Sequence, residues 1–360
     1  MSAAPPRRGV VLWARGGTAN LGVAVLAEGT RRMAEDAWPG IELDTQYYSD
    51  GPAPRTIASP RLLLRDAVLG RVGLRTWLRG YDVALDTRMG DSFADIYGLK
   101  RLRALVAMGE FTRRAGVPLV LTPQTVGPFE TREGRLLGAW SLKRADVVLC
   151  RDPVSAQVAA ELGCPDPVVT TDVVFALDVP EPAGTADVML NVSGLLWTSD
   201  RHGPAREYRR TVTGLVDALR AAGREVTLLA HVLDSPEADN DVPVVRELGH
   251  QWGLPVAVPS GLAEVRALLR GANLLIGSRM HACLNSISVG TPGIALAYSR
   301  KFAPLLGELG WDAVVDLRDP DAGPRAAELA ATDLTASVEA TRRRAADLLG
   351  RARTALRALA

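Results

Sequence analysis

Apolar runs of strand length alternate with polar turns and helical stretches along the chain. The first example is the buried run 9–14, the glycine-rich turn 16–22 and a helix that begins near Val23. Apolar runs bounded by turn residues are typical of buried strands, and a 3.6-residue period is typical of helices. Strands that alternate with helices predict an α/β fold with parallel sheets and right-handed crossovers.

The same pattern continues to the end of the chain. It predicts further strands at 83–85, 119–121, 147–149, 188–192, 226–230, 274–276 and 293–297, and helices at 102–115, 153–162 and 207–222. Asp152 and Pro153 have the residue types that favour the N-cap and the first position of a helix. The final stretch from Asp333 has apolar residues at helical spacing, which predicts an amphipathic helix packed across the domains.

A proline- and glycine-bearing link near 178–184 divides the chain into two similar halves. A length of 360 residues also exceeds that of one ordinary domain. We therefore predict an N-terminal domain at 1–178, a second domain at 186–332 and a C-terminal helix at 333–360.

Composition and charge exclude several classes of protein. Hydrophobic residues at 47% and charged residues at 23% are close to globular averages, and a net charge of +1 excludes a globally basic protein that coats nucleic acid. Three cysteines without metal-ligand spacing argue against a disulfide framework or a zinc site, so we expect them to be buried. The segment 1–8 is basic and the apolar run behind it is brief, which argues against a signal peptide and predicts a cytoplasmic location.

The strongest candidate chemistry lies at 277–281, directly after a predicted strand. Ligands of open parallel sheets bind beyond the carboxyl ends of strands. We expect Ser278 to cap the next helix and Arg279 and His281 to lie in its first turn, where free N–H groups attract anions. Lys301, one of only three lysines, follows the next strand. A core histidine and a solvated lysine are the alternative interpretations of His281 and Lys301.

Several motifs together resemble the polysaccharide pyruvyl transferase family. The segment 277–292 is similar to the family's Gly-x-Arg-x-His block. The other similar segments are 86–98 (Gly-Asp-Ser-Phe-x-Asp-x-Tyr-Gly), 124–129 (Gln-x-x-Gly-Pro-Phe), 151–155 (Arg-Asp-x-x-Ser), 191–194, His231 with Asn240-Asp241, and 298–301. Their order over most of the chain makes the resemblance fairly specific.

The resemblance implies two Rossmann-like domains that face across a cleft, as in the glycosyltransferase B architecture. It implies phosphoenolpyruvate as a co-substrate, with no other cofactor and no metal, and a sugar, glycan or glycosylated small molecule as acceptor. His281 and Lys301 would be catalytic. The donor-binding residues would be Arg151, Ser193, His231, Ser278 and Arg279, and the acceptor-binding residues Asn20, Asp86, Arg88, Asp91 and Gln124.

The chain departs from the family pattern at two places. Acidic residues usually follow the family's Asn-x-Gly turn, whereas here Val23 and Ala24 follow Gly22. Arg88 and Met89 stand where small residues are expected before Gly90. Both differences bear on the identity of the acceptor.

Two alternative functions stay open. A nucleotide-sugar glycosyltransferase would use the same architecture, and a non-catalytic glycan- or metabolite-binding homologue would keep the fold alone.

Arginines at 61, 65, 71, 75 and 79 interleave with apolar residues. This pattern is typical either of a solvated helix face or of a basic surface for peripheral contact with the inner face of a membrane.

Overall fold

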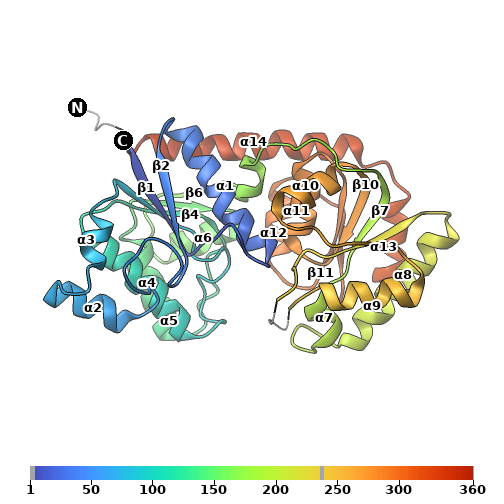
Figure 1. Ribbon diagram of the computed structural model, residues 1–360, viewed down its shortest axis with the longest axis horizontal. Coiled ribbons are helices and arrows are strands. Elements are labelled where there is room, and N and C mark those ends of the chain that lie inside the picture. The colour runs from blue at the N-terminus through green and yellow to red at the C-terminus, as the bar shows by residue number, and fades with distance from the viewer. Residues whose placement is uncertain (1–4, 236–238, 360) are drawn as a thin grey trace. The chain divides into compact units, whose positions relative to one another are not determined.

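The computed structural model describes residues 5–235 and 239–359, and these fall into two compact units (Figure 1). Unit 1 contains residues 5–16, 26–176 and 345–359. Unit 2 contains residues 17–25 and, apart from 236–238, residues 177–344. Residues 17–25 thus belong to unit 2, although they precede most of unit 1 in the sequence.

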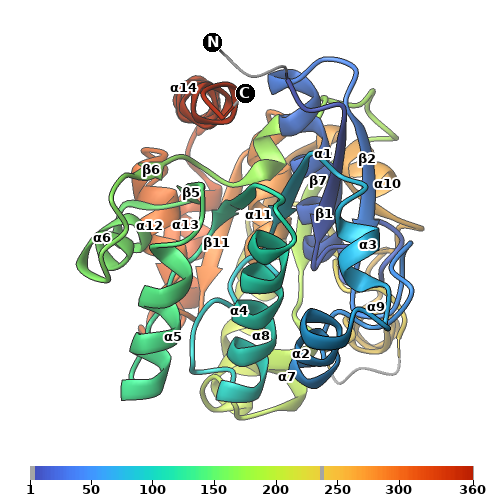
Figure 2. The same cartoon turned by 90° about the vertical axis from the view of Figure 1, so that its left-hand side faces the viewer.

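Unit 1 contains a parallel six-stranded sheet. Its strands are β1 (Arg8–Leu12), β2 (Glu42–Gln46), β3 (Val83–Asp86), β4 (Leu119–Gln124), β5 (Val147–Cys150) and β6 (Pro167–Val169), in the spatial order β2-β1-β3-β4-β5-β6. Its helices are most of α1 (Leu21–Ala37), α2 (Pro60–Leu69), α3 (Leu74–Leu78), α4 (Leu99–Arg114), α5 (Arg132–Leu142) and α6 (Pro153–Glu161). Figure 2 shows this unit, with α2 beside α4.

Unit 2 contains a second parallel sheet of six strands. They are β7 (Ala186–Asn191), β8 (Val226–Leu229), β9 (Val256–Ala257), β10 (Ala272–Gly277), β11 (Gly293–Ala297) and β12 (Val314–Asp316), in the order β12-β11-β10-β7-β8-β9. The helices are α7 (Gly194–Thr198), α8 (Ala205–Ala221), α9 (Val242–Trp252), α10 (Leu262–Arg270), α11 (Met280–Ser288), α12 (Phe302–Glu308) and α13 (Ala322–Ala330). This is the Rossmann strand order. Successive strands are added outward on one side of β7 up to β9 and on its other side from β10 onward, and such folds bind ligands at the point between β7 and β10 where the order changes side.

These sheets confirm the predicted α/β fold with two Rossmann-like parts. All the strands predicted from apolar runs are present within a few residues of their expected bounds. The four strands that the pattern missed are β2, β6, β9 and β12, which are the edge strands of the two sheets. An edge strand is covered on fewer sides, and these four contain mostly half-buried or exposed positions, so they lack a continuous apolar run.

Local sequence signals set the ends of several helices. The side chain of Asp152 accepts a hydrogen bond from the backbone N–H of Ser155 and caps α6 as predicted. The C-terminal helix α14 (Thr335–Arg357) is also present, and its residues are divided between the two units. Within unit 1, Arg353 pairs with Asp36 at 2.7 Å.

Among the described residues, no helix has both the length and the apolar character needed to cross a membrane.

Candidate functional site

A cavity of about 100 Å³ lies in unit 2, beyond the carboxyl ends of β8, β10 and β11. Its lining residues are Asn20, Gly22, His231, Val232, Arg279, Met280, His281, Tyr298 and Lys301. Residues from the start of α1 join those from the strand ends because Asn20 forms an antiparallel bridge with Val232. Five of the residues predicted to form the site therefore lie around one cavity: Asn20, His231, Arg279, His281 and Lys301.

Helix α11 places His281 at the cavity. The N-cap position is Arg279, so His281 lies in the first turn, where backbone N–H groups have no partner within the helix. The prediction that Ser278 caps this helix is wrong. The Ser278 hydroxyl instead lies 2.8 Å from the hydroxyl of Tyr208, and the N–H of Arg279 donates to Oδ1 of Asn191 at 3.0 Å.

Gly22 allows the imidazole of His281 to approach the start of α1. A Cβ atom at position 22 would lie 2.8 Å from Nδ1 of His281 and 3.2 Å from its Cγ. The side chain of Asn20 accepts a hydrogen bond from the N–H of Gly22 at 3.1 Å and holds the same turn. The Asn20-Leu21-Gly22 turn therefore shapes one wall of the cavity.

The guanidinium of Arg279 is held by aspartates. Its Nη2 lies 2.7 Å from Oδ1 of Asp241 and also bonds to the carbonyl of Asp239, and Nη1 lies 3.8 Å from the Asp239 carboxylate. Burial alone would lower the pKa of Arg279, but the Asp241 carboxylate raises it. Arg279 is thus charged, and its position is set before any ligand binds.

Asp241 makes the contacts that hold the site together, although the sequence pointed to it only as part of a motif with His231 and Asn240. Its buried carboxylate accepts hydrogen bonds from the N–H groups of His231, Val232 and Gly194, in addition to pairing with Arg279. Asp241 immediately precedes α9, so in the sequence it resembles a simple helix cap. Its contacts join segments about 40 to 50 residues apart, which no local pattern records.

His231 is buried and neutral. Arg266 can only donate, and it donates a hydrogen bond to Oδ1 of Asn285. The amide nitrogen of Asn285 is therefore the atom that faces Nε2 of His231, at 3.1 Å. Nε2 therefore accepts, and the ring carries its proton on Nδ1. Burial, together with the charges of His281 and Arg279, lowers the pKa of His231 to about 3.

Ser193 and Ser278 lie behind the cavity wall in a buried network. The N–H of Ser193 donates to the Tyr208 hydroxyl, which also bonds to Ser278. Burial raises the pKa of Tyr208 to about 12. Neither serine is among the lining residues, so both support the ends of β7 and β10 from within.

Tyr298, which lines the cavity together with Lys301, contacts two other rings. Tyr298 contacts Phe302 edge to face at 5.7 Å and His202 at 5.1 Å between ring centroids. Partial burial lowers the pKa of His202, and the charges of Lys301, Arg201 and Arg279 add to this effect. His202 lies in a polar loop without motif character, so the sequence offered no signal for its place beside Tyr298.

Unit 1 holds the other predicted residues. Asp86 and Arg88 are fully buried and form an ion pair of 2.9 Å between Oδ2 and Nε. Arg88 also donates to Ser141 and stacks over Phe93. Burial raises the pKa of Asp86, and the positive charge of Arg88 lowers it by less. Both side chains thus build the core beneath the loop, and neither is exposed to a ligand in this structure.

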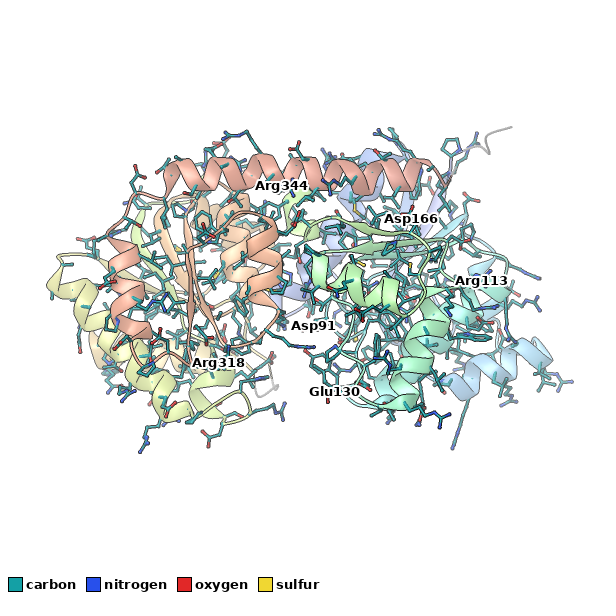
Figure 3. All side chains as sticks on the ribbon, turned by 180° about the vertical axis from the view of Figure 1, so that it is seen from behind. Asp91, Arg113, Glu130, Asp166, Arg318 and Arg344 are labelled. Atoms are coloured by element: carbon teal, nitrogen blue, oxygen red, sulfur yellow. The ribbon has the colours of Figure 1, made fainter. Side chains whose placement is uncertain are left out.

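The loop after β3 has an unusual backbone. Arg88, Met89 and Gly90 all have positive φ angles, of 49°, 58° and 79°. Non-glycine residues are strained in this region, which explains why small residues are expected at the first two positions. Asp91, labelled in Figure 3, follows the loop and is partly exposed. Its carboxylate accepts a hydrogen bond from the Tyr97 hydroxyl at 3.0 Å.

Gln124 and Arg151 lie together at the carboxyl edge of β4 and β5. The N–H of Arg151 donates to the carbonyl of Gln124, and its guanidinium pairs with Asp172 and Thr125. The Gln124 side chain is fully buried, and neither of its amide atoms has a hydrogen-bond partner among the described residues. Buried amides without partners are rare and often mark a position where a ligand or water binds.

The cysteines and the possible metal ligands were the remaining side chains considered in the sequence. Cys150, Cys164 and Cys283 are free and buried, as the sequence predicts. In the described part of the chain, no three His, Cys, Asp or Glu side chains are grouped so as to hold a metal ion.

Comparison with known proteins identifies relatives of this chain. The family model for polysaccharide pyruvyl transferase matches residues 20–300. The amylovoran biosynthesis protein AmsJ of Erwinia amylovora is 25% identical over 259 residues, which are 65% of this chain and 60% of AmsJ. The match therefore spans less than two thirds of that relative.

Solved structures with the same fold are more distant in sequence. The UDP-GlcNAc 2-epimerase of Methanocaldococcus jannaschii has a TM-score of 0.55 at 11% identity, over 91% of this chain and 93% of the epimerase. Anabaena HepE, in complex with UDP and glucose, has a TM-score of 0.53 at 14% identity, over 97% of each chain. These likenesses show a glycosyltransferase B-like fold.

Proposed function

The chain belongs to the polysaccharide pyruvyl transferase family, and we propose that it transfers the enolpyruvyl group of phosphoenolpyruvate to two hydroxyls of a sugar or glycan. The products would be a cyclic pyruvate ketal and phosphate. The observation that carries the proposal is the unit 2 cavity, which joins the ammonium of Lys301, the first turn of α11 and the imidazole of His281.

The cavity has the groups needed to bind a small dianion. Phosphoenolpyruvate carries a phosphate and a carboxylate. Lys301 and the N-terminal end of α11 can bind one of these anions, because the helix dipole adds to the attraction of the ammonium. The guanidinium of Arg279 is already engaged by Asp241, so we assign it a supporting role, in which it adds positive charge and holds the turn.

His281 is the proposed general acid. It would donate a proton to the methylene carbon of phosphoenolpyruvate, which leaves an oxocarbenium-like centre at the adjacent carbon. One acceptor hydroxyl adds to that carbon and releases its proton to solvent. The oxygen of the second hydroxyl then displaces phosphate from the same carbon, and the departing phosphate takes up the proton of that hydroxyl as the ketal closes. Burial keeps His231 neutral, so it can offer a hydrogen bond without adding charge.

Unit 1 contains the unpaired amide of Gln124. We propose that this amide contacts an acceptor hydroxyl and that Arg151, beside it, contributes charge. Asp91 is a partly exposed carboxylate on the same loop as the buried pair of Asp86 and Arg88.

Calorimetry tests the donor before any acceptor is known. We expect phosphoenolpyruvate to bind the full chain and UDP-glucose to bind at least tenfold more weakly. Lys301→Met should weaken binding, whereas Lys100→Met, which removes an exposed lysine from α4, should not. Equal binding of both donors, or no effect of Lys301→Met, would argue against the assignment.

A second measurement tests the reaction. Phosphate release and the mass of the product are followed with a panel of saccharide acceptors. His281→Ala should lower kcat by about 10² to 10⁴ while donor binding is retained. His250→Ala, at an exposed position of α9, is the matched control. Near-normal turnover by His281→Ala would exclude His281 as the general acid.

A further inference from the structure

Helix α2 of unit 1 exposes three large apolar side chains. Leu64, Val68 and Leu69 are 66%, 73% and 52% exposed. Leu64 and Val68 are four residues apart and lie on one face of the helix. On the opposite face Leu63 and Asp66 are buried, and α2 packs against α3 and α4 (Figure 2). An exposed cluster of this kind is typical of an interaction site.

The exposed charged side chains of segment 51–80 all have one sign. Segment 51–80 contains six arginines, at 55, 61, 65, 71, 75 and 79, and one acid, Asp66. The Asp66 carboxylate is buried and accepts hydrogen bonds from the N–H groups of Val72, Gly73 and Arg75. The only negative charge of the segment therefore faces inward. The exposed charges are positive, although the whole chain has a net charge of only +1.

The buried aspartate also fixes the direction in which α2 points. By capping the start of α3, Asp66 ties the inner face of α2 to the next helix. Arg61, Leu64, Arg65 and Val68 then project together, at the i, i+3, i+4 and i+7 positions of one face. Leu69, the last residue of the helix, and Arg71, just beyond its end, continue this surface. We call these six residues the α2 surface.

We propose that the α2 surface docks the protein on a bilayer that contains anionic lipids. The aliphatic side chains would enter the boundary of the acyl chains, and the arginines would contact the headgroup phosphates. A ten-residue helix is about 15 Å long, which is too small for the roughly 800 Å² that each partner buries in a stable protein complex. The phosphates of a nucleic acid would contact the arginines but would leave the two leucines and the valine exposed to water, so a lipid surface fits this set of side chains better.

Vesicle sedimentation tests the proposal with the full chain and no substrate, so its outcome is independent of the proposed reaction. We expect binding to vesicles of phosphatidylcholine with phosphatidylserine and at least tenfold weaker binding to phosphatidylcholine alone. Binding should weaken as salt rises, because salt screens the charges. Equal binding to both vesicle types would overturn the proposal, as would tighter binding to duplex DNA than to the anionic vesicles.

Two sets of substitutions separate the charged and apolar contributions. The triple variant Arg61→Gln, Arg65→Gln, Arg71→Gln should lower the partition coefficient by roughly a hundredfold, since each arginine contributes about fivefold. The triple variant Leu64→Ser, Val68→Ser, Leu69→Ser should lower it at least tenfold. Full binding by either variant would contradict the proposal.

Control variants carry the same changes on other helices. Arg206→Gln, Arg210→Gln, Arg246→Gln removes three exposed arginines from α8 and α9 of unit 2, and Leu136→Ser removes a leucine that is 64% exposed on α5. Both should bind vesicles as the unchanged chain does. All variants should keep the circular dichroism and unfolding temperature of the unchanged chain, because the altered side chains are exposed.

A fluorescent probe tests insertion directly. The three native cysteines are buried, so a single cysteine on the surface can be labelled selectively. A probe attached after Leu64→Cys should shift its emission to the blue on anionic vesicles, and one attached after Leu136→Cys should not. A shift at both sites, or at neither, would mean that α2 does not insert.

Discussion

Gly22 lies against the imidazole of His281, at the point where the first turn of α1 meets the first turn of α11. A Cβ at position 22 would lie 2.8 Å from Nδ1, closer than side chains tolerate. The general acid proposed for the reaction is therefore placed in part by the absence of a side chain.

This contact makes Gly22→Ala an informative substitution. The added methyl group should displace His281 and lower kcat by at least tenfold, since a misplaced acid loses much of its contribution of about 10² to 10⁴. Gly17→Ala, in the same segment but with open space around it, is the control and should keep full activity. Unchanged turnover in Gly22→Ala would mean that His281 does not need this position.

The buried His231 should make stability depend on pH. Its folded pKa of about 3 lies below the ordinary value of 6.5, so the unfolded chain binds a proton in that range and the folded protein does not. Its contribution is complete above pH 6.5 and falls by about 1.4 kcal/mol for each pH unit down to about 3. Urea unfolding should therefore show that the stability difference between the unchanged chain and His231→Gln shifts by this amount per pH unit.

Asn285 offers a control for the same effect. In Asn285→Asp a carboxylate would face Nε2 of His231 and favour the protonated ring, so the slope between pH 6.5 and 3 should become shallower. Parallel stability curves for the unchanged chain and His231→Gln would show instead that His231 titrates normally in the folded protein.

The buried pair of Asp86 and Arg88 should be costly to break. Asp86→Asn leaves the Arg88 guanidinium buried without its partner, which should lower the free energy of unfolding by about 3–5 kcal/mol. Replacing both, as Asp86→Leu with Arg88→Met, should cost less than Asp86→Asn alone. Arg318→Gln breaks the exposed pair with Asp316 and should cost less than about 1 kcal/mol in the same urea titration (Figure 3). Similar losses for Asp86→Asn and Arg318→Gln would refute this account.

Gln124 should affect the acceptor and not the donor. Its buried amide has no partner among the described residues, so Gln124→Leu should not lower stability. If the amide binds an acceptor hydroxyl, KM for the acceptor should rise about tenfold while phosphoenolpyruvate binding is unchanged. Gln157→Leu, at an exposed position of α6, is the control. A loss of donor affinity in Gln124→Leu would place the amide on the donor side.

Much of the fold could be predicted because it depends on neighbouring residues. The interior strands have continuous apolar runs, and helix α6 has its cap and proline in adjacent positions. The residues Arg279, His281 and Lys301 were found from their places after strands, since the ends of parallel strands meet at one edge of a sheet.

The sequence by itself thus determined the interior strands, most of the helices, the family and the positions of Arg279, His281 and Lys301 after the strands of the second sheet. Only the tertiary structure decided the edge strands, the pairing of Arg279 with Asp241, the place of Ser278 behind the wall and the burial of Asp86 with Arg88. It also brought Asn20 and Gly22 to the cavity of unit 2. These features depend on contacts between residues far apart in the chain, and a local pattern of apolar and polar positions carries no information about such contacts.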